Sequence, residues 1–199
     1  MKISVILGHP GGKSFNHAMA KQAVAALKRN GHRVFYHDLY AERFDPVLPL
    51  HEIPGKGARD RTIRKHCREI RESDGIVIIH PNWWGQPPAI LKGWIDRVLR
   101  AGVAYEFEEG DLGEGIPNGL LKARTALIYN TSNTPARREQ RVFGDPLDNL
   151  WKTCILEFCG VGKTVRRLFG VVVTSTLEKR RNWLKIVEKD INKHFPRCR

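Results

Sequence analysis

The sequence has no long apolar run and only four cysteines among its 199 residues. No stretch approaches the roughly 20 apolar residues of a membrane-spanning helix, and the amino-terminal run MKISVIL is too short for a signal peptide. The cysteines lack the Cys-x-x-Cys spacing of zinc and redox sites, and they are Cys67, Cys154, Cys159 and Cys198. These absences predict a reduced, cytoplasmic protein rather than a secreted disulfide scaffold.

Acidic residues are scarce, with 21 set against 34 lysines and arginines, and the formal net charge is +13. Such an excess is typical of proteins with anionic partners, such as nucleotide phosphates, nucleic acids or membrane surfaces. Many basic residues fall on a predicted helix over 59–73, and no nucleic-acid-binding motif accompanies them. We therefore expect a solvated face and no nucleic-acid partner. The histidines also lack metal-ligand spacing, so no metal site is predicted.

Short apolar segments alternate with segments of helical periodicity along the whole chain. Strands are predicted over 3–7, 33–39, 75–79, 125–129 and 165–174, the last bent near Gly170. Helices are predicted over 14–30, 59–73, 89–100, 147–159 and 177–195, and the segments 40–58 and 108–120 look irregular. This alternation predicts a doubly wound α/β fold whose five parallel strands run in the order 2-1-3-4-5. The length favours a single domain over residues 1–199.

Three loops follow the first, third and fourth predicted strands and should meet at the carboxyl edge of the sheet, where α/β folds bind nucleotides. In the first loop, Gly11 and Gly12 free backbone N–H groups to approach a phosphate. Lys13 adds a positive charge, and Ser14 is a good N-cap for the following helix. An ordinary strand-to-helix turn explains this loop equally well when it is considered alone.

The second loop carries two adjacent tryptophans, Trp83 and Trp84, directly after a buried strand. A flat aromatic surface at this edge of a sheet suits a planar ligand. Packing in the core is the alternative, and it explains one of the two rings better than both. Pro87 and Pro88 then suit the first turn of a helix, where a missing N–H costs little.

The segments PAILKGWIDRV, at 88–98, and AYEF, at 104–107, resemble the flavodoxin-like NAD(P)H:quinone oxidoreductases, the DT-diaphorase family. The ancillary oxidoreductases of bacterial potassium-efflux systems belong to the same broad group. The resemblance implies a flavodoxin-like fold and a bound flavin that passes a hydride from NAD(P)H, through its N5 atom, to a quinone by ping-pong kinetics. It also implies a homodimer in which the partner chain completes the slot beside the flavin ring.

The residues expected to hold the flavin come from the three loops. They are His9, Lys13, Ser14, Phe15, Asn16, Pro81, Asn82, Trp83, Trp84, Gly85, Thr131, Ser132 and Asn133. Backbone N–H groups around Trp83, Trp84 and Gly85 are expected to donate to the ring and to stabilise the charge that appears on reduction. Trp84 and Tyr105 are the candidates to line the substrate slot. FMN is preferred over FAD because a phosphate loop is recognisable and an adenine site is not.

Two departures from the family pattern concern the third loop and the segment after it. The family's Thr-Thr-Gly-Gly is replaced by the run from Thr131 to Thr134, which keeps donors but lacks glycines. Phe143 stands where the animal enzymes have a histidine assigned to proton and charge relay, so that role cannot be transferred. Two other functions stay open: a regulatory flavin-binding subunit of a membrane potassium-efflux transporter, and a one-electron flavodoxin carrier. The strongly basic charge argues against the carrier.

Overall fold

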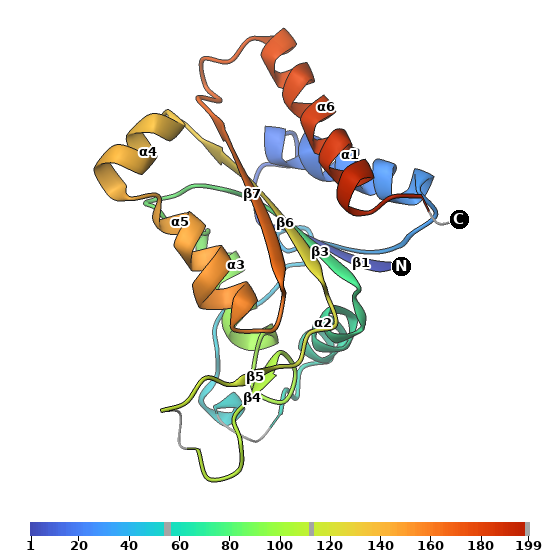
Figure 1. Ribbon diagram of the computed structural model, residues 1–199, viewed down its shortest axis with the longest axis vertical. Coiled ribbons are helices and arrows are strands. Elements are labelled where there is room, and N and C mark those ends of the chain that lie inside the picture. The colour runs from blue at the N-terminus through green and yellow to red at the C-terminus, as the bar shows by residue number, and fades with distance from the viewer. Residues whose placement is uncertain (54–56, 112–113, 198–199) are drawn as a thin grey trace.

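The computed structural model describes residues 1–53, 57–111 and 114–197, and Cys198 lies outside them (Figure 1). Five parallel strands form one sheet in the order β2-β1-β3-β6-β7. They span Lys2–Leu7 (β1), Arg33–Asp38 (β2), Gly75–Pro81 (β3), Thr125–Ser132 (β6) and Lys163–Gly170 (β7). Taken in chain order, these strands have the predicted 2-1-3-4-5 arrangement, which confirms the doubly wound, flavodoxin-like fold.

Helices cover both faces of the sheet (Figure 1). One face is covered by α1 (Phe15–Arg29) and α6 (Leu177–His194). The other is covered by α2 (Arg61–Glu72), α3 (Ala89–Val98), α5 (Pro146–Asn149) and the π-helix η2 (Leu150–Glu157). Strand β3 is buried on both faces, because Ile76 and Ile78 enter one apolar cluster while Val77 and Ile79 enter the other.

Side-chain caps fix where the long helices begin. Ser14 accepts a hydrogen bond from the backbone N–H of His17 at the start of α1, as predicted. Asp60 accepts from two backbone N–H groups at the start of α2, and Thr176 accepts from the Lys179 N–H at the start of α6. Among the described residues, no helix has the length and apolar character needed to cross a membrane.

Several sequence-based boundaries were wrong. The last strand begins at Lys163 and ends at Gly170, so the segment 171–174 is not part of it. The predicted helix over 147–159 is a short α5 followed by π-helical turns. The supposedly irregular segments contain a 3-10 turn, η1 (Leu50–Glu52), and the strand β5 (Asn118–Gly119), which pairs with β4 (Tyr105–Glu106). Helix α4 (Ala136–Phe143) was not predicted at all.

Candidate functional site

The strand register brings the three predicted loops together at one edge of the sheet. Leu7 lies opposite Ile79, and Pro81 lies opposite Thr131, so β1, β3 and β6 end side by side. Hydrogen bonds continue this alignment into the loops. The Gly8 N–H donates to the Ile79 carbonyl at 3.0 Å, and the Asn82 N–H donates to the Thr131 carbonyl at 2.6 Å.

The first loop folds as a compact turn against the start of α1. The Ser14 N–H donates to the Gly11 carbonyl at 2.9 Å, and the Gly11 N–H donates to Nδ1 of His9 at 3.0 Å. Burial and the neighbouring His17 lower the pKa of His9, so this ring offers a neutral Nε2–H donor. Lys13 is exposed. The loop therefore presents backbone and side-chain donors together with one positive charge.

Asn16 links the first loop to the third. Its side-chain amide, buried in α1, donates to the Thr131 hydroxyl at 2.9 Å, while its side-chain oxygen is buried without a donor from the described residues. A buried acceptor without a donor carries a desolvation cost that a ligand hydroxyl would remove. Phe15 instead faces the core, because its ring packs on Trp183 of α6 at 5.6 Å.

The second loop is a tight turn from Trp83 to Gln86, closed by two reciprocal backbone hydrogen bonds of 3.1 and 3.0 Å. Its central residues, Trp84 and Gly85, have φ angles of +57° and +71°. The amides of Trp83 and Gly85 already have acceptors, the Gln86 carbonyl and the Asn82 side chain, so only the Trp84 N–H is left for a ligand. The Trp84 ring is fully exposed, with a relative accessibility of 101%.

A cavity of about 530 Å³ lies between this turn, the third loop, α4 and the start of α5. Its walls are formed by Asn82, Trp84, Gly85, Ser132, Asn133, Thr134, Arg138, Glu139, Phe143 and Pro146. The volume falls within the range of small-molecule and cofactor sites, as does the mixture of aromatic rings with a few polar groups. Pro81 and Thr131 are buried at the adjoining strand ends.

Sequence reasoning missed the buried network that supports this cavity. His80 donates through Nδ1 to the Pro81 carbonyl at 2.8 Å. Its Nε2 accepts from the Trp151 indole at 2.9 Å and from the Asn130 amide at 2.8 Å. Full burial lowers the pKa of His80 to about 3, so the ring stays neutral and can donate through Nδ1 while it accepts through Nε2. The network fixes the backbone where the second loop begins.

The same network reaches the opposite wall through Arg166. Its Nε donates to the Asn130 side-chain oxygen at 2.7 Å, and its two terminal nitrogens bind the Asp145 carboxylate at 2.8 and 2.7 Å. Asp145 precedes Pro146, which lines the cavity. A bidentate arginine–carboxylate pair of this kind fixes geometry as well as charge. Both walls are therefore anchored to the sheet.

A family model described as "Flavodoxin-like fold" matches residues 1–183 of the sequence. The chain belongs to this family. An uncharacterized NAD(P)H oxidoreductase of Haemophilus influenzae is 33% identical over 175 residues, covering 83% of this chain and 82% of that protein. The mouse ribosyldihydronicotinamide dehydrogenase [quinone] is 30% identical over 203 residues, covering 90% and 86%. The crystal structure of Smu.1420 from Streptococcus mutans has a TM-score of 0.83 and 31% identity, covering 97% of this chain and all of that one. The resemblance inferred from the sequence is thereby confirmed.

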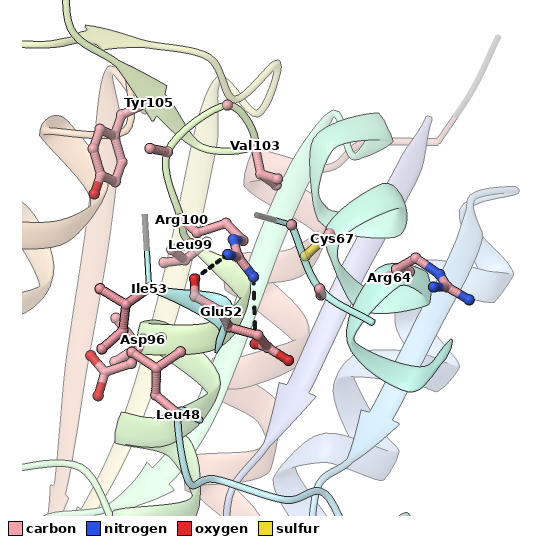
Figure 2. A pocket seen from close by; sticks show the side chains of 15 residues that line it. Leu48, Glu52, Ile53, Arg64, Cys67, Asp96, Leu99, Arg100, Val103 and Tyr105 are labelled. Carbon is pink, nitrogen blue, oxygen red and sulfur yellow. Dashed lines mark hydrogen bonds and ion pairs between the residues drawn. The ribbon is translucent and has the colours of Figure 1, made fainter. Parts of the chain in front are cut away.

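In this flavodoxin-like chain, Tyr105 lies apart from Trp84. It lines a second hollow of about 820 Å³, formed by α2, the end of α3, η1 and the segment before β4 (Figure 2). The Tyr105 ring packs edge-on against Phe158 at 4.9 Å. Trp84 belongs to the other cavity, so one chain does not bring the two predicted slot residues together.

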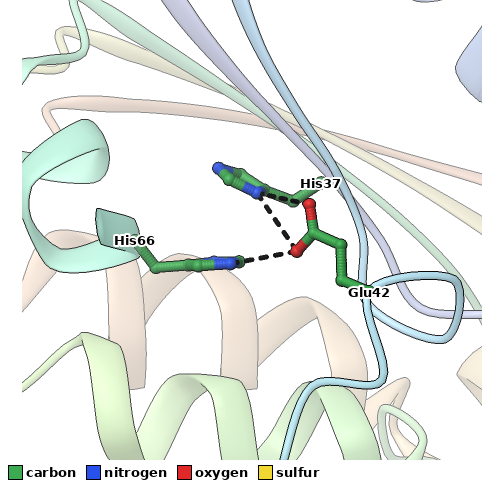
Figure 3. A group of neighbouring side chains, drawn as sticks. All are labelled: His37, Glu42 and His66. Carbon is green, nitrogen blue, oxygen red and sulfur yellow. Dashed lines mark hydrogen bonds and ion pairs between the residues drawn. The ribbon is translucent and has the colours of Figure 1, made fainter. Parts of the chain in front are cut away.

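A cluster of His37, Glu42 and His66 has atoms close enough to hold a metal ion (Figure 3). However, Nδ1 of His66 accepts from the Trp94 indole at 3.0 Å, so its Nε2 must carry the proton that faces Glu42. A metal on Nε2 would move a proton to Nδ1 and set two donors against each other. Partial burial acts to raise the pKa of Glu42, but hydrogen bonds from both histidines lower it to about 2. This cluster is a satisfied hydrogen-bond network between β2, α2 and α3.

Proposed function

We propose that this protein is a flavin-dependent NAD(P)H oxidoreductase that passes a hydride to a quinone or a similar acceptor. The observation that carries the proposal is the 530 Å³ cavity at the carboxyl edge of the sheet, bounded by Trp84 and by the third loop. The Haemophilus relative is named an NAD(P)H oxidoreductase and the mouse relative a quinone-linked dehydrogenase, which supports the same chemistry here. We further propose that it acts in the cytoplasm.

The residues present fit a flavin. The first loop offers His9, Lys13 and the start of α1 to a phosphate. The buried Asn16 oxygen lacks a donor, which a hydroxyl of the flavin side chain would supply. The cavity beside Trp84 has the size for a planar ring system. We prefer FMN over FAD because no adenine site is recognisable. The bound flavin would supply the hydride chemistry.

The chain's own residues would bind the flavin, orient the substrates and shield them from water. The indole of Trp84 offers an aromatic face for stacking, and the backbone N–H of Trp84 is available to the edge of the flavin ring system. Hydride transfer needs the donor and the ring at roughly 3–3.5 Å with water excluded, which favours one slot used in turn by both substrates. Arg138 lines this cavity and, with Arg137 and Arg141, gives α4 the cations that the 2′-phosphate of NADPH needs.

The first test is the colour and reactivity of the purified protein. We expect the purified protein to hold one flavin per chain. In stopped flow, NADPH should bleach the flavin and menadione should reoxidise it. Steady-state kinetics with the two substrates should give parallel double-reciprocal lines. Trp84→Ala removes the stacking surface and should lower kcat/KM by about three- to tenfold. Tyr105→Phe should have a smaller effect, confined to the acceptor half-reaction. A protein that stays colourless with both FMN and FAD contradicts the proposal.

We also propose a symmetric homodimer whose partner chain brings its Tyr105 to the slot. Leu48 and Ile53 line the hollow that contains Tyr105 and are exposed, and Val47 and Leu50 of the same segment are also exposed. Patches of this kind mark protein interfaces. Sedimentation velocity should therefore give the mass of two chains. A monomer with full activity would exclude the arrangement.

A regulatory subunit of a membrane potassium-efflux transporter is the alternative, and the positive charge suits a membrane-bound partner. The two functions differ in the stopped-flow experiment. If neither NADPH nor NADH bleaches a bound flavin within minutes, the regulatory function or the carrier function replaces the enzyme.

A further inference from the structure

Three side chains form a continuous hydrogen-bonded chain along one wall of the Trp84 cavity. The hydroxyls of Ser132 and Thr134 lie 2.7 Å apart, and the Thr134 hydroxyl donates to the carboxylate of Glu139. The Thr134 N–H also donates to the Ser132 hydroxyl at 3.0 Å, which holds the two in line. All three residues line the cavity.

Glu139 is an unusual residue for such a wall. It is only 4% exposed, and no lysine, arginine or histidine pairs with it in the described part of the chain. Its hydrogen-bond partner in this wall is the Thr134 hydroxyl, which connects the carboxyl group of Glu139 to Ser132 and the cavity.

The hydroxyl chain has two arrangements of its hydrogens. When Glu139 is ionised, Thr134 donates to it and Ser132 donates to Thr134. When Glu139 carries a proton, each of these bonds reverses, and the Ser132 hydroxyl turns outward as a donor into the cavity. Moving between the two arrangements transfers one proton between Glu139 and the cavity without moving a heavy atom.

The other cavity residues do not offer this chemistry. Phe143 is apolar and has no proton to give. The guanidinium of Arg138 lies over the Phe143 ring at 5.8 Å, and an arginine does not release its proton. Among the described residues that line the cavity, Glu139 is the one with a carboxyl group.

We propose that Glu139, acting through Thr134 and Ser132, supplies the proton that accompanies hydride transfer. The proposal rests on the proposed function. Reducing a quinone to its hydroquinone requires a hydride, which brings both electrons and one hydrogen, and a separate proton. The proton leaves the Glu139 carboxyl, one proton shifts at each hydroxyl, and the Ser132 proton enters the cavity. Glu139 is then a carboxylate, and it regains a proton from solvent in each cycle.

The first experiment needs no flavin. Infrared spectra of the apoprotein are recorded at neutral pH for wild type and Glu139→Gln. The difference should contain the carbonyl band of a protonated carboxylic acid. Glu178→Gln is the matched control, because Glu178 also lies in the first turn of a helix but is exposed. Its difference spectrum should show carboxylate bands and the bands of the new glutamine amide, but no carboxylic-acid band. A Glu139 spectrum without the carboxylic-acid band overturns the proposal.

The second experiment uses the protein loaded with FMN. Menadione is mixed with the reduced protein, and time-resolved infrared spectra of the wild type should show transient loss of that carboxylic band as the quinone is reduced. Thr134→Val keeps the side-chain shape but breaks the chain, so the band should persist during quinone reduction. Thr134→Ser restores the hydroxyl and should restore the loss. In steady state, Glu139→Gln and Thr134→Val should both slow menadione reduction by about a hundredfold, with most of the loss in kcat.

The outcomes separate the two proposals. Band loss that continues in Thr134→Val overturns the relay, as does a rate in Glu139→Gln equal to that of Glu178→Gln. An apoprotein with the protonated Glu139 band that binds neither FMN nor FAD contradicts the proposed function, and the redox role of the relay falls with it. A purely structural role for Thr134 predicts a lower unfolding midpoint with no change in the infrared response.

Discussion

Gly85→Ala is expected to weaken FMN binding by about tenfold or more, since a left-handed φ costs a non-glycine residue roughly 1–2 kcal/mol. The φ angle of Gly85 is +71°, and a Cβ atom there would lie 2.8 Å from Cγ of Pro146. Something in the cavity wall must therefore shift. Because the turn carries Trp84, the stacking surface moves with it. Quenching of FMN fluorescence on titration with the apoprotein measures the dissociation constant.

Two other glycines provide matched controls for Gly85. Gly110 has a φ of +89°, and a Cβ atom there would meet no atom within 4 Å, so Gly110→Ala tests backbone strain without a clash. Gly162 also has open space and lacks a left-handed φ, so Gly162→Ala should leave stability and FMN binding unchanged. An FMN affinity of Gly85→Ala equal to that of the wild type would show that the turn does not form a wall of the binding site.

Arg166→Met is expected to lower the free energy of unfolding by about 3–5 kcal/mol, the usual cost of removing one partner of a buried ion pair. The Arg166 side chain is 4% exposed and that of Asp145 is 16% exposed. The change leaves the carboxylate with no bidentate partner and also removes the donor to Asn130. Urea denaturation followed by tryptophan fluorescence measures the loss.

Lys163→Met on the same strand is the control for Arg166→Met, because Lys163 is exposed. It should change the unfolding free energy by no more than about 0.5 kcal/mol. The Arg166 variant should also bind FMN more weakly, since Pro146 follows the freed Asp145. Equal unfolding midpoints for the two variants would show that the buried pair contributes little to stability.

The sheet could be predicted from sequence because its central strands carry unbroken apolar runs, such as that from Ile76 to Ile79. Helix α4 could not, because its eight residues show no apolar stripe and follow Pro135 in a polar segment. The two-residue strands of the β4–β5 hairpin are too short for a periodic pattern. The start of β7 was missed because Lys163 and Thr164 are polar.

The loops of the site could be found because glycines, prolines and paired tryptophans follow strand ends. Their roles depend on contacts across the fold. The bonds that join His80 to Trp151, or Arg166 to Asp145, connect segments far apart in the chain, and no spacing rule reveals them. Conversely, Tyr105 and Trp84 were grouped by the resemblance, whereas the structure places them in different cavities of one chain.

The full exposure of the Trp84 ring has a consequence for engineering. The turn that holds it is closed by backbone hydrogen bonds and by Asn82, and the indole supports none of them. Trp84 has a left-handed φ of +57°, which proline cannot adopt and β-branched residues adopt poorly. Most other exposed substitutions change stability by no more than about 0.5 kcal/mol, so this position should accept a library that omits those residues with little loss of soluble protein. Selection on new electron acceptors could then vary the shape of the slot at a single codon, while the network around His80 keeps the scaffold constant.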